Sequence, residues 1–502
     1  MRRDALWIAA GVLLLHLWTA PRYGYFGDEL YFLACGEHLD WGYVDQPPMI
    51  GLVSWLVRHT LGTSLLAIRS ISALCAALLV WLTALIAAEL GGGRFAQALA
   101  ALCAAFGGVY LVIGYLFTMN AFEPLFWMGC AYVLIRIVKT GNQKLWLWFG
   151  LLAGLGLENK YSMAVFGGAV VVALLLTPER KALREKWIWL AGALAFLIIL
   201  PNIVWNIRHD WPFLELMRNI RESGRDVKLP PLQFLVQQIM VMNPGTFPVW
   251  LAGLAWLFFT RDGRAFRVLG WTFVTVFAAF LLLSGKDYYI SPAYPMILAA
   301  GSVAIERLTA PRGRMWIRAV PVVVLLSFTA YMLPLVLPVV SVETYLAYQE
   351  KMPLKPEASE KSHRAAALPH HYAWQFGWEE MVATVADAYQ KLSPEERKHA
   401  AIFGENYAEA GAIDLFGPKY GLPKAIGGHQ SYFLWGPRDY KGEVVIVIGT
   451  SVRDLETKCD KVEVAANLHH PYGAVWENGP VLVCRGLKSN LQEIWPKVKN
   501  WD

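Results

Sequence analysis

The sequence predicts a polytopic α-helical membrane protein that ends in a soluble α/β domain. Of its 502 residues, 56% are hydrophobic and only 17% are charged, and the mean hydropathy is +0.38. One water-soluble core cannot bury that much apolar surface. Before Ser341 the apolar residues recur in blocks of roughly 15 to 25, the length that a bilayer core requires. After Ser341 the composition is that of a soluble protein. We therefore expect a transmembrane domain over 1–340 and a soluble domain over 341–502.

The transmembrane domain is predicted to hold about eleven spanning helices. The apolar runs lie at 5–20, 65–90, 95–117, 122–138, 145–157, 163–176, 187–205, 246–259, 268–284, 289–305 and 316–340. The first run also fits a secretory signal peptide, but no persuasive cleavage site precedes Pro21, so we interpret it as a retained anchor. The weakest regions are 145–157, which is short and Gly-rich, and 231–259, where prolines separate a possible interfacial helix from a span.

Basic residues concentrate in alternate connectors between these runs. They are Arg2, Arg3, Arg94, Arg136, Lys139, Lys144, Arg180, Lys181, Arg184, Lys186, Arg261, Arg264, Arg267, Arg307, Arg312 and Arg314. By the positive-inside rule these connectors face the cytoplasm. An odd number of spans then places the soluble domain on the outer face of a plasma membrane. The formal charge of +6 is interpreted as a mark of orientation and not of nucleic-acid binding.

The opposite connectors have a different composition. The loop from Arg22 to Pro48 is long, acidic and aromatic, and it contains Asp28 and Glu29. The other outward ends carry Asn120, Glu123, Lys160, Arg208, His209, Asp210, Lys286, Asp287, Tyr288 and Tyr289. Charged groups are thus expected to gather at one membrane face.

The acidic residues have two interpretations each. Asp28 is either the N-cap of an amphipathic helix over 29–39, with Glu29 in its first turn, or a general base toward an acceptor hydroxyl. Glu123 either closes a capping box with Asn120 or faces a cavity, because a carboxylate at membrane depth must face protein or water.

The basic and aromatic residues are equally open to a structural explanation. Lys160 and Lys286 are placed as snorkelling lysines, and Tyr288 and Tyr289 as part of an interfacial aromatic belt. Together with Arg208, however, these lysines share a face with an acidic loop. Cations suit a phosphate leaving group and a carboxylate suits an attacking hydroxyl, so the combination indicates transfer from a phosphate-linked lipid.

Two motif classes give limited information. No phosphate-binding loop or Gly-x-Gly-x-x-Gly occurs in a strand-to-helix setting, which argues against nucleotide hydrolysis or a dinucleotide cofactor. Cys459 and Cys484 share the soluble domain and are able to pair in an oxidising compartment, but the sequence does not show whether they are close.

The motifs at 27–32 (GDELYF) and 42–49 (GYVDQPPM) resemble those of bacterial membrane glycosyltransferases related to protein O-mannosyltransferases and to the lipid A aminoarabinose transferase. These enzymes belong to the GT-C class. The later 286–289 (KDYY) and 292–295 (PAYP) add support. The resemblance implies an inverting transfer of a hexosyl or pentosyl group from a polyprenyl-phosphate donor to an acceptor hydroxyl, at the outer face of the bacterial inner membrane. It implies no nucleotide, and the acceptor is a lipid, a glycan or a protein.

The same resemblance assigns roles to the acidic residues. Asp28 matches the first-loop catalytic acid, with Glu29 beside it. Glu123 stands where relatives carry a second acidic residue, often Asp. Some relatives hold a divalent ion near the acidic loop and others are described as metal-independent, so a metal on Asp28 and Glu123 is left open and no other cofactor is expected.

The remaining site residues would bind the donor. Lys160 and Lys286 match positions associated with the donor phosphate, Arg208 is a looser match, and Tyr288 and Tyr289 accompany Lys286. A lipid or sugar transporter, or flippase, that uses the outward charges as a vestibule is the first alternative function. A sensor whose soluble domain binds a ligand is the second.

The soluble domain is predicted to alternate strands and helices. Strands are expected from Ala400 and over 444–448, 462–466 and 481–484, with helices up to Phe416 and over 452–458. The segments 404–407 and 428–436 are polar and aromatic. Turn and cap chemistry explains them, and an acceptor-facing surface is the alternative.

Overall fold

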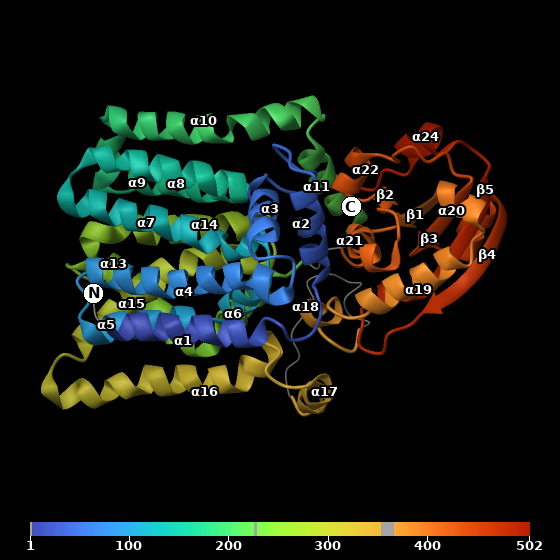
Figure 1. Ribbon diagram of the computed structural model, residues 1–502. Coiled ribbons are helices and arrows are strands. Elements are labelled where there is room, and N and C mark those ends of the chain that lie inside the picture. The colour runs from blue at the N-terminus through green and yellow to red at the C-terminus, as the bar shows by residue number, and fades with distance from the viewer. Residues whose placement is uncertain (1–2, 225–227, 353–365) are drawn as a thin grey trace. The chain divides into compact units, whose positions relative to one another are not determined.

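The computed structural model describes residues 3–224, 228–352 and 366–502, which fold into two compact units (Figure 1). The first unit comprises Met1–Pro21, Leu66–Val204 and Lys228–Val340. The second comprises Arg22–Leu65, Trp205–Val227 and Ser341–Asp502. The second unit thus contains the predicted C-terminal domain together with two segments from the first 340 residues. Among the predicted cytoplasmic residues, Arg2 and the side chain of Arg312 lie outside the description.

Each predicted apolar run coincides with helix. In chain order these helices are α1 (Arg3–Thr19), α4 (Leu65–Glu89), α5 (Arg94–Ala105) with α6 (Gly108–Tyr115), α7 (Glu123–Thr140), α8 (Trp146–Asn159), α9 (Met163–Leu175), α10 (Lys186–Arg208), α13 (Phe247–Phe259), α14 (Arg267–Leu282), α15 (Tyr294–Leu308) and α16 (Ala319–Val336). The shorter α12 (Pro231–Met242) precedes α13, so the prolines do divide that region as expected.

Length and composition identify fewer certain spans than helices. Within the described ranges, five helices are long and apolar enough to cross a membrane, or up to seven if each of two bent pairs is one span. One bent pair is α5 with α6, which meet at 60°. The first unit is therefore a bundle of apolar helices, and the count of eleven spans stays a prediction.

Small residues let two of these helices approach closely. A Cβ atom on Gly253 of α13 would overlap the carbonyl oxygen of Ile297 in α15, and one on Gly301 would overlap that of Val249. Such contacts between backbones are the usual packing of helices in lipid, where no hydrophobic force acts between them.

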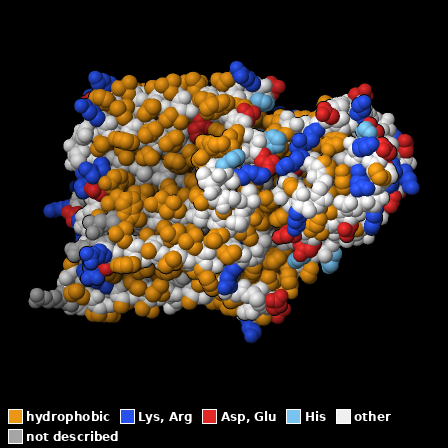
Figure 2. Space-filling model, in the orientation of Figure 1, with side chains coloured by type: hydrophobic (Ala, Val, Ile, Leu, Met, Phe, Trp, Pro, Cys, Tyr) orange, Lys and Arg blue, Asp and Glu red, His pale blue; other side chains and the backbone are white. Residues whose placement is uncertain are grey.

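Ion pairs join the basic connectors at one end of this bundle. The pairs are Asp4 with Arg94 (2.5 Å), Glu89 with Lys139 (2.7 Å) and Asp262 with Arg307. In addition, the Glu306 carboxylate accepts hydrogen bonds from the backbone amides of Gly93 and Phe95. Lys and Arg side chains gather at this end of the bundle, on the left of the view (Figure 2). The connectors predicted to share one side of the membrane therefore meet in space.

The second unit begins with the acidic, aromatic loop, which forms α2 (Gly27–Glu37) and α3 (Met49–Thr60). A Cβ atom on Gly27 would lie 2.6 Å from the Trp374 ring, and one on Gly411 would lie 2.9 Å from the Leu30 backbone. Glycine at both positions lets α2 pack against the C-terminal segment. The helices of that segment are α17 (Val342–Glu350), α18 (His370–Ala373), α19 (Trp378–Gln390), α20 (Pro394–His399), α21 (Tyr407–Phe416), α22 (Ser431–Trp435), α23 (Val452–Glu456) and α24 (Leu491–Ile494).

A five-stranded sheet forms the centre of the C-terminal segment, which confirms the predicted α/β pattern. Its strands are β1 (Ala400–Gly404), β2 (Ile426–Gly427), β3 (Val444–Ile448), β4 (Cys459–Leu468) and β5 (Gly479–Leu487). The order is β2-β1-β3-β5-β4, with β1 parallel to β2 and β3, and β5 antiparallel to β3 and β4. Every residue of β3 is buried, as its run of Val and Ile predicts for a central strand.

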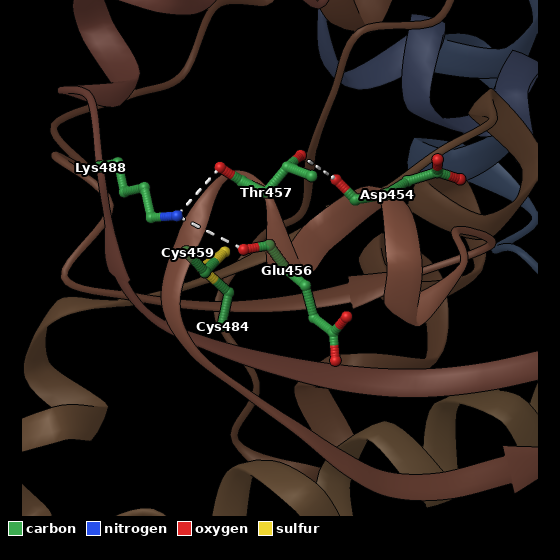
Figure 3. The surroundings of a disulfide bond; sticks show 6 residues. All are labelled: Asp454, Glu456, Thr457, Cys459, Cys484 and Lys488. Carbon is green, nitrogen blue, oxygen red and sulfur yellow. Dashed lines mark hydrogen bonds between the residues drawn. A yellow bond between two sulfur atoms is a disulfide. The ribbon is translucent and has the colours of Figure 1, made fainter.

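The pairing that the sequence left open is present. Cys459 at the start of β4 and Cys484 in β5 form a disulfide with their Cα atoms 5.8 Å apart (Figure 3). Nearby, the Lys488 ammonium donates to the Thr457 carbonyl at 3.1 Å. The bond therefore links the edge strand β4 to its neighbour β5. The other four cysteines are free and buried.

Candidate functional site

Asp28 lies in the first turn of α2 and is not the helix cap. The helix begins at Gly27, with Phe26 in the N-cap position. Glu29 supplies the cap, since its Oε2 accepts a hydrogen bond from the Phe26 backbone amide at 2.8 Å and the side chain is fully buried. The N-cap interpretation of Asp28 is therefore wrong. Because Glu29 caps the helix, the neighbouring Asp28 carboxylate is not needed for that role.

Asp28 is held by a tyrosine from the C-terminal segment. The Tyr407 hydroxyl donates to Asp28 Oδ1 at 2.8 Å. The Tyr407 ring lies 4.7 Å from that of Tyr31 and stacks on that of His429 at 4.8 Å, so it is fixed by aromatic neighbours. Sequence reasoning marked 404–407 for its polar and aromatic content but had no signal for this contact, which spans 379 positions.

The expected cap chemistry in that segment is also present. Asn406 Oδ1 accepts hydrogen bonds from the backbone amides of Ala408 and Glu409, at 2.9 and 3.0 Å. Glu409 Oε2 in turn accepts from the Asn406 amide at 3.1 Å, which completes a capping box for α21. The cap fixes the start of α21, where Tyr407 stands, and so aims Tyr407 at Asp28.

Asp45 is a second carboxyl group beside Asp28 that sequence reasoning placed in a motif but not in the site. The Tyr31 hydroxyl donates to Asp45 Oδ1 at 2.9 Å and lies 2.7 Å from Ser431 Oγ. Burial and, to a smaller extent, the charge of Asp28 raise the pKa of Asp45 to about 7, against the lowering effect of the Tyr31 hydrogen bond. A carboxyl group with a pKa near neutral, close to a second carboxyl group, is an arrangement found where protons are transferred.

Arg208 ends α10 and its side chain is exposed. The same helix end is tied to the acidic loop, because Trp205 Nε1 donates to Asp40 Oδ2 at 2.7 Å and the His209 ring stacks on Trp205 at 4.2 Å. The predicted phosphate-binding arginine is thus next in sequence to a fixed aromatic pair.

Glu123 and Lys160 form a buried ion pair in the first unit. Lys160 Nζ lies 2.9 Å from Glu123 Oε2 and 2.7 Å from Asn120 Oδ1, and the two charged side chains are 17% and 5% exposed. The other carboxylate oxygen of Glu123 accepts a hydrogen bond from Ser162. Both carboxylate oxygens of Glu123 therefore accept hydrogen bonds from Lys160 and Ser162, and Glu123 does not form the predicted capping box with Asn120. Of the three ammonium donors of Lys160, two are occupied by these contacts.

Aromatic rings lie over the same ammonium group. Lys160 Nζ is 4.9 Å from the ring centre of Tyr289 and 6.0 Å from that of Tyr288, within the range of a cation–π contact. Both tyrosines belong to a 3-10 segment, Asp287–Ala293, that precedes α15, so the helix begins later than the apolar run predicted.

Lys286 immediately precedes that segment and is half-buried. Burial raises the pKa of the adjacent Asp287, and the charge of Lys286 opposes that shift. Gln238 Nε2 of α12 donates to the Asp287 carbonyl at 2.8 Å and so fixes the backbone beside Lys286.

The predicted site residues thus form two groups. Glu123, Lys160, Tyr288 and Tyr289 lie together in the first unit, and Lys286 immediately precedes the short segment that carries the tyrosines. The second unit contains Asp28, Glu29 and Arg208.

A divalent metal was left open by the sequence. In the part of the chain that the structure describes, no group of three or more His, Cys, Asp or Glu side chains is placed to hold a metal ion. The mechanism below is written for the residues of the chain alone.

The sequence matches known proteins over part of its length. Residues 45–205 match the family model described as dolichyl-phosphate-mannose-protein mannosyltransferase. A lipid A galacturonosyltransferase of Rhizobium johnstonii is 26% identical over 257 residues, which cover 49% of this chain and 52% of that protein. The match thus spans about half the length of this curated relative.

The fold matches solved structures over nearly all of the chain. The crystal structure of ArnT from Cupriavidus metallidurans, bound to undecaprenyl phosphate, gives a TM-score of 0.62 at 16% identity and covers 95% of this chain and 97% of that one. An oligosaccharyltransferase of Archaeoglobus fulgidus with a tethered acceptor peptide gives a TM-score of 0.50 at 12% identity, over 84% of this chain and 63% of that one. These likenesses show that the chain has the fold of those structures.

Proposed function

We propose, for a chain with the fold of the GT-C glycosyltransferases, that it transfers a sugar from a polyprenyl-phosphate donor to an acceptor hydroxyl with inversion. The observation that carries the proposal is the contact of Asp28 with Tyr407, which holds the first-loop carboxylate within an ArnT-like fold. A general base must be held in place by its neighbours before it can accept a proton from a bound substrate.

The proposed reaction is a single displacement. The acceptor oxygen attacks the anomeric carbon, the bond from that carbon to the phosphate oxygen breaks, and the acceptor proton passes to Asp28. The lipid phosphate leaves with the electron pair of the broken bond. Lys286 and the remaining N–H of Lys160 stabilise the charge that develops on it. Glu123 orients Lys160, and Glu29 fixes the turn that carries Asp28.

Placement in the membrane is part of the proposal. Eleven spans, a cytoplasmic N-terminus and an outer C-terminal domain would put Asp28 on the outer face of the inner membrane. The clustering of basic connectors at one end of the bundle supports this orientation. The disulfide in the C-terminal segment supports it independently, because disulfides persist mainly outside the cytoplasm.

The proposed partners are a polyprenyl-phosphate sugar and a lipid, glycan or protein that bears a free hydroxyl. The curated relative is a lipid A glycosyltransferase, which favours a lipid acceptor. The sugar, whether hexosyl or pentosyl, is to be identified by testing donors of both kinds.

One experiment separates this function from a transporter or flippase. Purified protein in nanodiscs is mixed with a polyprenyl-phosphate sugar and candidate acceptors, and both free polyprenyl phosphate and glycosylated acceptor are measured. A transferase yields the two products in equal amounts. If the donor instead crosses the bilayer of sealed vesicles with its sugar still attached, the proposal is overturned.

A further inference from the structure

Helix α11 (Pro212–Ser223) follows the end of α10 by three residues. Asp210 and Trp211 in this connection both have φ near +56°, an uncommon backbone state for residues other than glycine, and they turn the chain sharply. The 23 residues of α10 reach about 34 Å, enough to cross a bilayer core. If α10 spans, as the proposed function requires, α11 begins at the membrane surface.

One face of α11 is fixed to the rest of the second unit. Leu216 is buried, the Glu215 carboxylate pairs with Lys499 at 2.6 Å, and Asn219 Nδ2 donates to the Trp501 carbonyl at 2.6 Å. The helix is therefore held against the segment 499–501, and its orientation is set by these contacts.

The other face of α11 is exposed and mixes apolar with basic side chains. Trp211, Leu214 and Met217 are 42%, 58% and 40% exposed. Arg218 and Arg221 are exposed on the same side, since these positions recur at helical spacing from Leu214. We call this set of five residues the α11 face. Asp210 and Glu222 are the exposed carboxylates nearest to it in sequence.

We propose that the α11 face docks onto the headgroup layer of the bilayer and binds anionic phospholipid. Burying tryptophan, leucine and methionine side chains in the boundary between headgroups and acyl chains is favourable, because it removes their apolar surface from water. Arginines at the same level pair with lipid phosphates, which attracts such a helix to anionic membranes. Charge complementarity thus selects acidic phospholipid as the occupant. The inference rests on the membrane placement within the proposed function and not on the transfer reaction.

The test uses a fluorophore attached to one introduced cysteine. The native cysteines are buried or disulfide-bonded, so the thiol of Leu214→Cys reacts selectively. The labelled full-length protein is placed in nanodiscs of phosphatidylcholine with or without 30% phosphatidylglycerol. Quenching by lipids that carry a spin label near the headgroup is then measured at positions 214 and 395, and quenching by lipids labelled near the end of an acyl chain is measured at position 197. Glu395→Cys on α20 is the aqueous control, and Leu197→Cys, exposed on α10, reports whether α10 is in the bilayer.

The expected result is quenching at position 214 that exceeds the aqueous control and rises at least two-fold with phosphatidylglycerol. Arg218→Gln with Arg221→Gln should remove that rise. Equal quenching at positions 214 and 395 would overturn the inference. The same quenching at position 214 with and without phosphatidylglycerol would also overturn it. The comparison of nanodiscs with and without phosphatidylglycerol uses protein that keeps Arg218 and Arg221. That comparison therefore tests the inference even if the double variant misfolds. Failure of position 197 to quench would instead reject the membrane placement itself.

Discussion

The Tyr407 hydroxyl donates a hydrogen bond of 2.8 Å to Asp28 Oδ1, which joins the C-terminal segment to the turn that carries the proposed base. A carboxylate that acts as a general base must be held in position by its neighbours. The C-terminal segment therefore takes part in positioning Asp28.

Tyr407→Phe should slow transfer by about ten-fold. The ring remains to stack on His429, but Asp28 loses one donor, which is worth about 1.5 kcal/mol for a charged acceptor. The measurement is kcat/KM with purified protein. Tyr440→Phe, which alters a tyrosine elsewhere in the same segment, should leave kcat/KM unchanged. An unchanged kcat/KM in Tyr407→Phe would remove Tyr407 from the site.

Asp28→Asn should reduce transfer at least about 100-fold, the lower end of what a general base contributes. Folding and membrane insertion should be normal, because Glu29 and not Asp28 caps α2. The measurement is release of free polyprenyl phosphate, with size-exclusion behaviour as the control for folding. Near-normal turnover in this variant would exclude Asp28 as the base.

Asp45 should make stability depend on pH. Burial raises its pKa from the ordinary value of 3.8 to about 7, so between these values the folded chain holds a proton that the unfolded chain has lost. The free energy of unfolding therefore falls as the pH rises through this window. Asp45→Asn cannot titrate, so the Tm of the wild-type protein relative to this variant should fall between about pH 4 and pH 7. If plots of Tm against pH for the wild-type protein and for Asp45→Asn run parallel, the Asp45 carboxyl group is not protonated in the folded protein over this range.

Glu123→Gln should destabilise the protein by about 3 kcal/mol or more, because it leaves the largely buried Lys160 without its counter-charge. Replacing both residues, as Glu123→Gln with Lys160→Met, should cost less than the sum of the two single changes. Thermal unfolding of the four proteins in one detergent measures the cycle. Additive losses would mean that the pair is not coupled.

Lys286→Ala should raise the KM for the donor about five- to ten-fold through loss of a cation near the leaving phosphate. The matched control is Lys144→Ala, a lysine from the predicted cytoplasmic connectors. A donor titration unchanged from wild type would place Lys286 outside the site.

The positions of the apolar helices were predictable because periodicity and length depend on neighbouring residues. The run at 163–176 is α9 to within one residue, and that at 65–90 is α4. The same local patterns found the strands of the C-terminal sheet. The α15 start was missed, since the apolar run continues backward through a 3-10 segment that hydropathy does not distinguish from helix.

The contacts that build the site depend on chain segments far apart in sequence. Nothing around Asp28 signals that its partner is Tyr407, and nothing around Glu123 signals a bond to Ser162. For Asp28 and Glu29, the sequence also did not show which residue caps the helix. Either residue suits a helix start, and only the position of Gly27 in the first turn decides that Glu29 makes the cap.

The second unit is assembled from three separate stretches of chain. A chimera that replaces only 341–502 with the equivalent part of a relative would mismatch α2 at Tyr407 and α11 at Lys499. Exchange of this part between relatives, in the laboratory or in evolution, must therefore carry the loop at 22–65 and the segment at 205–227 along with it. Substrate preference encoded there would be inherited as a set of three coevolving pieces.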